Sequence, residues 1–142
     1  MKLTILGRYG KFPCVDGSTC GYLLQSEKAN ILIEAGSGTL RNLVKILPYQ
    51  DIDAIVLSHH HGDHTADAYV FRNIAFEYVK TMVWEARIPV FMPHTPAADF
   101  SALSSCIGFD AKVISDRMKV SVKDIELEFF AAKHPLETYG MV

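Results

Sequence analysis

The sequence has few cysteines and no arrangement of them that suits a disulfide framework. Its three cysteines, Cys14, Cys20 and Cys106, are odd in number and show no Cys-x-x-Cys spacing. This argues against a disulfide-stapled secreted domain and against a paired-cysteine zinc module. We therefore predict reduced thiols in a cytoplasmic protein, with cysteine serving mainly as a small apolar residue.

A strong charge of either sign and a long apolar run are also missing. Fourteen lysines and arginines against 16 aspartates and glutamates give a net charge of -2. No overall basic field is present to recruit nucleic acid or anionic lipid, although a local basic patch remains open. No apolar stretch approaches the ~18 residues that span a bilayer, and the first six residues suit a strand better than a signal peptide. We expect no membrane association.

What is present suits one globular domain. The chain has 142 residues, of which 49% are hydrophobic and 21% charged, enough to bury a real core. We find no internal repeat, linker or low-complexity segment, and expect a single domain over residues 1–142.

Hydrophobic periodicity predicts alternating strands and helices, followed by strands alone. Leu40, Leu43, Val44 and Leu47 follow helical spacing, and Val70, Ile74, Tyr78 and Met82 form the expected stripe of the longest helix. Helices are expected over 39–47, 67–83 and 96–103. Strands are expected over 2–6, 22–26, 30–34, 52–57, 88–92, 112–114, 118–122 and 125–131. This order favours a layered α/β fold with a mixed sheet.

The most informative stretch is Ser58-His-His-His-Gly-Asp-His64, directly after the apolar run 52–57. Neutral imidazole and carboxylate are ligands that zinc accepts. His59 and His61, two residues apart in an extended loop, would point the same way and hold one metal, while Asp63 and His64 could turn toward a second. The carboxyl end of a buried strand is a common place for a site in α/β sheets. This density of donors favours a metal site over an inert surface cluster.

These residues carry a resemblance to a known family. His59-x-His61-x-Asp63-His64 resembles the signature of the metallo-β-lactamase superfamily, and Glu34-Ala-Gly-Ser-Gly38 resembles its Asp-x-Gly-x-Gly strand end. Glu34 stands where aspartate is usual, which leaves open whether it supports the loop. The resemblance implies that His59, His61 and the later strand-end histidine, His134, bind one zinc, and that Asp63 and His64 bind a second; manganese and iron are alternatives.

The resemblance also implies an activity. We expect a zinc-dependent hydrolase that attacks a phosphodiester, of a small molecule or a nucleic acid, with metal-activated hydroxide. Asp63 could also take the proton of the attacking water. The glycine patterns Leu6-Gly-x-x-Gly10-x-x-Pro13 and Gly36-Ser-Gly-Thr39 resemble the ribonuclease Z and phosphodiesterase branch. Hydrolysis of a thioester, lactone or lactam at the same site is the alternative. His61 stands where flavo-diiron oxygen reductases carry glutamate, which favours zinc hydrolysis over redox iron.

By resemblance, the chain corresponds to the first αβ half of an αβ/βα sandwich, with a mixed sheet and helices on one side. The family's bridging aspartate and final histidine have no counterparts before Val142. We therefore expect a domain truncated before its second half, completed by a homodimer or by a partner that supplies the missing half. A third hypothesis is an incomplete half-domain that is inactive or acts as an assembly partner.

Three other polar residues receive structural roles. His60, between two expected ligands, should point away and steady the loop through a hydrogen bond. His94 is expected to be an ordinary loop residue. Asp67 is expected to cap a helix or to accept a hydrogen bond from a ligand imidazole.

Overall fold

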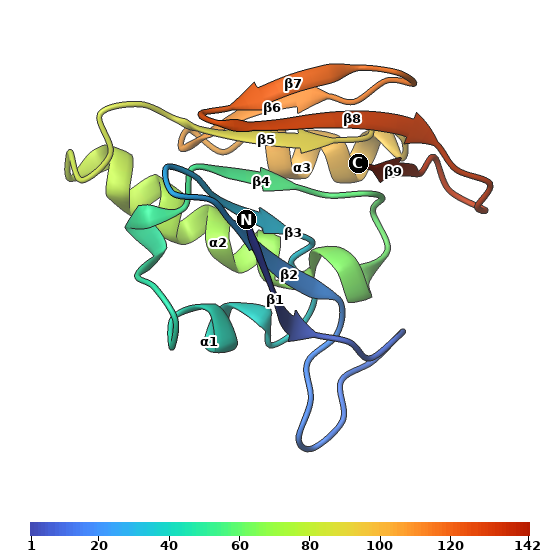
Figure 1. The fold of residues 1–142 in the computed structure, drawn as a ribbon, viewed down its shortest axis with the longest axis horizontal. Helices are drawn as coiled ribbons and strands as arrows, with labels where there is room; N and C mark the ends of the chain where they lie inside the picture. Colours follow the sequence, from blue (N-terminus) through green and yellow to red (C-terminus); the bar gives the residue numbers. More distant parts are fainter.

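The computed structural model describes all residues from 1 to 142 and contains two sheets (Figure 1). The larger sheet has six strands in sequence order: β1 (Lys2–Gly7), β2 (Gly21–Gln25), β3 (Asn30–Ile33), β4 (Ala54–Val56), β5 (Ile88–Met92) and β6 (Phe109–Val113). The first two pairs are antiparallel and the remaining three are parallel. The predicted mixed sheet is confirmed.

The smaller sheet is formed by the last three strands. β7 (Lys119–Val122) and β8 (Ile125–Ala131) are joined by a tight turn at Lys123 and Asp124, and β9 (Tyr139–Met141) pairs antiparallel with the other side of β8. Lys123 has a φ of 54°, the left-handed conformation that such a turn requires. The strands over 118–122 and 125–131 were predicted, but β9 was not.

Three helices connect the strands of the larger sheet: α1 (Thr39–Leu43), α2 (Gly62–Lys80) and α3 (Ala97–Ser104), together with a short 3-10 turn over Tyr49–Asp51. They lie on one face of the larger sheet, and the smaller sheet covers the other (Figure 1). None of the helices combines the length and the apolar character that crossing a bilayer needs.

Two hydrophobic cores follow from this layering, because successive strand residues point to opposite faces. On the helical face, Ile55 and Leu57 pack with Phe71 of α2 in a cluster of 18 buried residues. On the other face, Ala54 and Val56 pack with strand β8 in a cluster of ten. Strand β4 is therefore buried on both sides, as its continuous apolar run predicted.

The longest helix differs from its prediction in extent and in phase. It begins at Gly62 instead of 67, so Asp63 and His64 belong to its first turn and not to an extended loop. Its buried residues are Thr65, Ala68, Phe71 and Ala75, whereas Val70 of the predicted stripe is 51% exposed. The predicted stripe was wrong because small residues such as Ala68 and Ala75 face the sheet and let the helix pack closely against it. Helix α1, in contrast, is shorter than predicted and ends at Leu43.

Candidate metal centre

The candidate site lies at the carboxyl ends of the parallel strands. Strand β4 runs into the segment from Leu57 to His61, which ends at the first turn of α2, and strand β3 ends beside it at Ile33, directly before Glu34. His134 comes from the smaller sheet, in the connection between β8 and β9. The site is thus built where the two layers meet at one edge.

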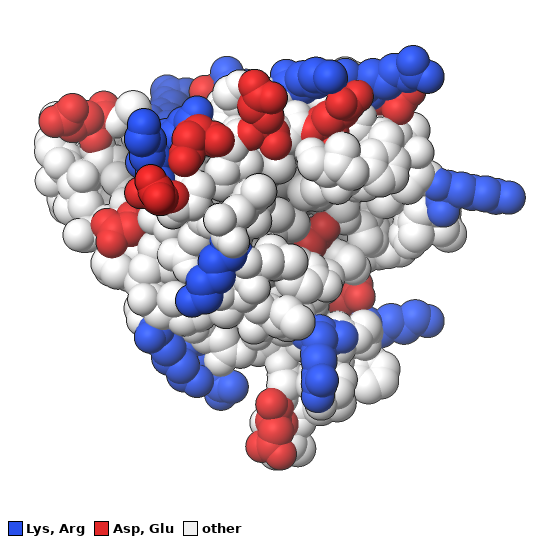
Figure 2. Space-filling view, viewed as in Figure 1, with Lys and Arg blue, Asp and Glu red and all other residues white.

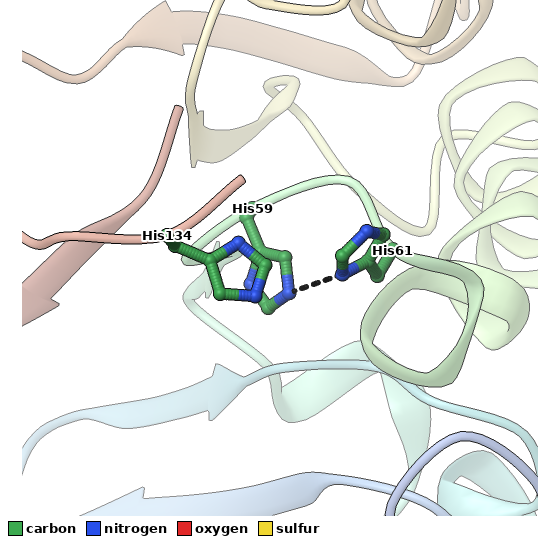
Figure 3. A group of neighbouring side chains, drawn as sticks. All are labelled: His59, His61 and His134. Carbon is green, nitrogen blue, oxygen red and sulfur yellow. Dashed lines mark hydrogen bonds between the residues drawn. The ribbon is translucent and has the colours of Figure 1, made fainter. Parts of the chain in front are cut away.

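Three imidazoles converge there (Figure 3). One ring nitrogen from each of His59, His61 and His134 lies within 4.8 Å of the others, and the Nε2 atom of His59 is 3.1 Å from Nδ1 of His61. In a tetrahedral zinc site with Zn–N bonds of about 2.0–2.1 Å, donor atoms are about 3.4 Å apart. Small side-chain rotations would therefore bring all three nitrogens to bonding distance of one ion. The three residues fit a divalent metal.

His59 is held in a form that suits a ligand. It is 5% exposed, and its Nδ1 lies 2.8 Å from the Ser58 hydroxyl, which leaves Nε2 directed at His61. Burial lowers the pKa of His59 to about 4, with a further lowering from the neighbouring imidazoles of His64, His134 and His61. The ring is consequently neutral at physiological pH and has a lone pair to offer.

Asp63 and His64 stand next to this group but not within it. The ring centroids of His64 and His59 are 4.1 Å apart, and Nε2 of His64 lies 3.6 Å from Oδ2 of Asp63. Burial raises the pKa of Asp63, but the backbone N–H of Lys11, 2.8 Å from Oδ2, and the nearby imidazoles outweigh this effect and lower it. Asp63 is therefore ionised. The structure brings all five predicted ligands to one edge, with three donors converging and the other pair alongside.

Glu34 supports the loop, which answers the question left by its replacement of aspartate. Its Oε1 accepts a hydrogen bond from the Ser58 N–H (3.1 Å), and Oε2 lies 3.4 Å from Nδ1 of His64. The longer side chain reaches both groups from a backbone with a φ of 57°. The neighbouring Gly36 is needed for a different reason: a Cβ there would lie 2.0 Å from the Asp63 carbonyl oxygen, so only glycine lets α2 begin this close.

The residues given structural roles behave as expected, with one refinement. Buried His60 points away from the cluster, and its Nε2 donates to the Pro93 carbonyl at 2.8 Å. His94 packs against Phe100, with ring centroids 5.0 Å apart. Asp67 does cap a helix, but a neighbouring one: its Oδ2 accepts the Leu40 N–H of α1 at 2.9 Å.

Two anchors of the site carried no signal in the sequence. The backbone N–H of Lys11 binds Asp63, and the backbone N–H of Tyr139 donates to the Ser58 carbonyl at 3.0 Å. Both are main-chain donors from segments distant in sequence, and neither depends on the type of side chain. Only the fold reveals them.

Comparison with known families decides the membership of the chain. The family model of the metallo-beta-lactamase superfamily matches residues 16–105, more than half of the sequence, including four of the five predicted ligands. The chain belongs to the metallo-beta-lactamase superfamily. The predicted family and fold are confirmed, whereas the assignment of the five residues as metal ligands stays a prediction.

Individual relatives agree with this assignment. The chain is 46% identical to the probable metallo-hydrolase YhfI of Bacillus subtilis over 67 residues, 47% of this chain and 28% of that protein. It is 23% identical to ribonuclease Z of Methanopyrus kandleri over 139 residues, 97% of this chain and 48% of that protein. These matches therefore cover about half or less of the length of each relative.

Solved structures show the same correspondence. The crystal structure of the metallo-beta-lactamase fold protein YhfI from Bacillus subtilis matches with a TM-score of 0.90 and 27% identity, over 98% of this chain and 56% of that one. Human tRNase Z, short form, matches with a TM-score of 0.73 and 20% identity, over 99% and 64%. The second likeness shows the fold alone. Both structures agree with the arrangement described above, in which helices pack on the larger sheet.

Proposed function

We propose that this superfamily member forms part of a zinc-dependent hydrolase in which His59, His61 and His134 bind one zinc ion and Asp63 and His64 bind a second. The observation that carries the proposal is the convergence of three imidazole nitrogens, from two different layers of the fold, within 4.8 Å. The relatives support a hydrolase: one is described as a probable metallo-hydrolase and another as ribonuclease Z. Manganese and iron are alternative metals.

In this proposal the protein supplies the ligands and the proton acceptor. A bound zinc ion contributes Lewis acidity, which lowers the pKa of water toward 7 and makes it a nucleophile. Asp63 is ionised, and so can accept the proton of the attacking water. Glu34 and Ser58 keep the loop and the His59 ring in one orientation, so that the donor atoms need little rearrangement on binding.

A phosphodiester is the proposed substrate class, either in a small molecule or in a nucleic acid. The depression beside the histidines is lined by Lys11, His61, Gly62 and Asp63, and Lys11 is exposed and forms no ion pair. Lys133, directly before His134, is also exposed. Figure 2 shows basic side chains projecting on the right-hand side of the molecule, where Figure 1 places the β8–β9 connection. Such cations suit a phosphate more than a neutral lactam.

A second candidate is an inactive half-domain that assembles with a partner. It is favoured by the observation that the donor atoms of Asp63 and His64 lie outside the cluster formed by His59, His61 and His134. We propose, as a related expectation, that the domain over residues 1–142 is completed by a second copy or by a partner carrying the missing half. A cytoplasmic location stays a prediction.

The test measures metal content, mass in solution and turnover together. The purified chain, loaded with zinc, is assayed against bis-p-nitrophenyl phosphate and against a thioester. We expect diester hydrolysis that is lost on chelation, restored by zinc, absent in His61→Ala and kept in His94→Ala. Activity on the thioester alone would overturn the phosphodiester assignment. Less than one zinc per chain without turnover would support the half-domain, and a mass of two chains would support the homodimer.

A further inference from the structure

The connection that carries His134 is tied down on both sides. A hydrogen bond from the Ala132 N–H to the Thr138 carbonyl (2.9 Å) joins the two ends of this connection. Directly after it, the Tyr139 N–H binds the carbonyl of Ser58, the residue before His59. Because His134 itself lies at the surface, its position depends on how firmly this connection is held.

Glu137 provides a further attachment, and the only one made by a charged side chain of this connection. Its Oε2 accepts a hydrogen bond from the Thr95 N–H at 2.8 Å, and its Oε1 accepts one from the Tyr139 hydroxyl at 2.9 Å. Burial raises the pKa of Glu137, but these hydrogen bonds and the nearby His94 imidazole outweigh burial and lower it. Glu137 is thus an anion, and its hydrogen bonds are charge-assisted and stronger than neutral ones.

The partner of Glu137 belongs to a segment that also holds the other histidine loop. Pro93 and Thr95 lie just after strand β5, and the Pro93 carbonyl accepts the hydrogen bond from His60, between His59 and His61 in the sequence. One short segment therefore braces both histidine-bearing loops. The bond from His60 fixes the first loop, and the bond to Glu137 fixes the second.

We propose that Glu137 is a positioning residue, which holds the β8–β9 connection against Thr95 and thereby keeps the His134 imidazole beside His59 and His61. This inference rests on the proposed metal site. The ring centroid of His134 lies 4.6 Å from that of His59 and 5.0 Å from that of His61. These distances depend on how the two histidine-bearing loops are placed relative to each other.

The experiment compares Glu137→Ala with Glu137→Gln. Glutamine keeps a carbonyl oxygen for the Thr95 N–H and an amide that can donate to the Tyr139 hydroxyl, so it should keep most of the wild-type behaviour although its hydrogen bonds are no longer charge-assisted. Exposed Glu85, which makes no side-chain hydrogen bond or ion pair, supplies the control Glu85→Ala. Zinc affinity is measured by competition with a chelator. In the metal-free protein, nuclear Overhauser contacts between the His134 and His59 rings report their proximity directly.

We expect Glu137→Ala to weaken zinc binding about tenfold, the size of effect that supporting residues around metal ligands show. The same substitution should remove the ring contacts, while Glu137→Gln and Glu85→Ala keep both. In a His134→Ala background, Glu137→Ala should cause no further loss, because its effect passes through His134. If Glu137→Ala fails to fold, Tyr139→Phe removes one of the two hydrogen bonds and should give a smaller loss in the same direction.

Failure of this inference can be told apart from failure of the proposed function. Unchanged zinc affinity and unchanged ring contacts in Glu137→Ala would overturn the positioning role while leaving the metal site intact. An equal loss of affinity in the His134→Ala background would also overturn it, since the effect would then be general. If the wild type binds no zinc, the proposed function fails, but loss of the ring contacts would still support the positioning role.

Discussion

Replacing Glu34 by glutamine tests how a buried carboxylate organises the segment over residues 57–61 and the first turn of α2. Glu34 is 4% exposed and faces two groups, the Ser58 N–H and Nδ1 of His64. Glutamine has nearly the same shape and keeps an oxygen for Ser58. What it removes is the negative charge opposite His64.

The charge of His64 sets the expected magnitude in the metal-free protein. Burial lowers the pKa of His64, but contacts with Cys20 and Glu34 outweigh burial and raise it to about 10. A fall of one to two units after the substitution corresponds to about 1.5–3 kcal/mol of lost stability. Because the folded pKa lies above the unfolded value of 6.5, this contribution is complete below pH 6.5 and disappears as the pH rises through 10.

The assay is urea unfolding of the chelator-treated protein at pH 6 and at pH 10, with an NMR titration of His64. We expect Glu34→Gln to lose about 1.5–3 kcal/mol at pH 6 and much less at pH 10. Glu126→Gln, at an exposed position of strand β8, is the control and should change little at either pH. An equal cost at both pH values, or an unchanged titration of His64, would refute the electrostatic explanation.

Two further predictions follow from other contacts. Burial and neighbouring imidazoles lower the pKa of His59 to about 4, so the unfolded chain binds more protons than the folded one below pH 6.5. The metal-free fold should therefore lose stability as the pH falls from 6.5 through 4. A urea midpoint that stays constant across this pH range would contradict the prediction. Asp67→Ala removes the acceptor of the Leu40 N–H and should lower the free energy of unfolding by about 1–2 kcal/mol, whereas Asp67→Asn should lower it less. An alanine variant that is as stable as the wild type in urea would show that water replaces the carboxylate as the acceptor.

The sequence was most informative where chemistry is local. The candidate ligands after strand β4 were recognisable because donor side chains follow a continuous apolar run, and that run is indeed buried on both faces. Glu34 could be located in the sequence, but its role could not, because its two contacts lie 24 and 30 residues further along the chain.

The start of α2 shows why some elements could not be predicted from the sequence. The sequence predicted a helix from residue 67, after an extended loop that carries the donor side chains through His64. The structure begins the helix at Gly62 because tertiary contacts hold its first turn: the Cys20 N–H donates to the Asp63 carbonyl, and the Ala35 N–H donates to that of His64. Strand β9 was missed for a similar reason, since its pairing with β8 depends on backbone groups brought together by the fold.

The brace at Pro93 and Thr95 has a consequence for how the chain folds. More than half of the sequence separates His59 from His134, and the contacts that bring them together come from the segment just after strand β5 and from the β8–β9 connection. Closing so long a loop costs entropy before any contact compensates for it, and long-range pairings of this kind slow folding. We therefore expect the three-histidine cluster to form late, after both sheets have assembled, so that a metal ion bound there would stabilise the finished fold over its partly folded precursors.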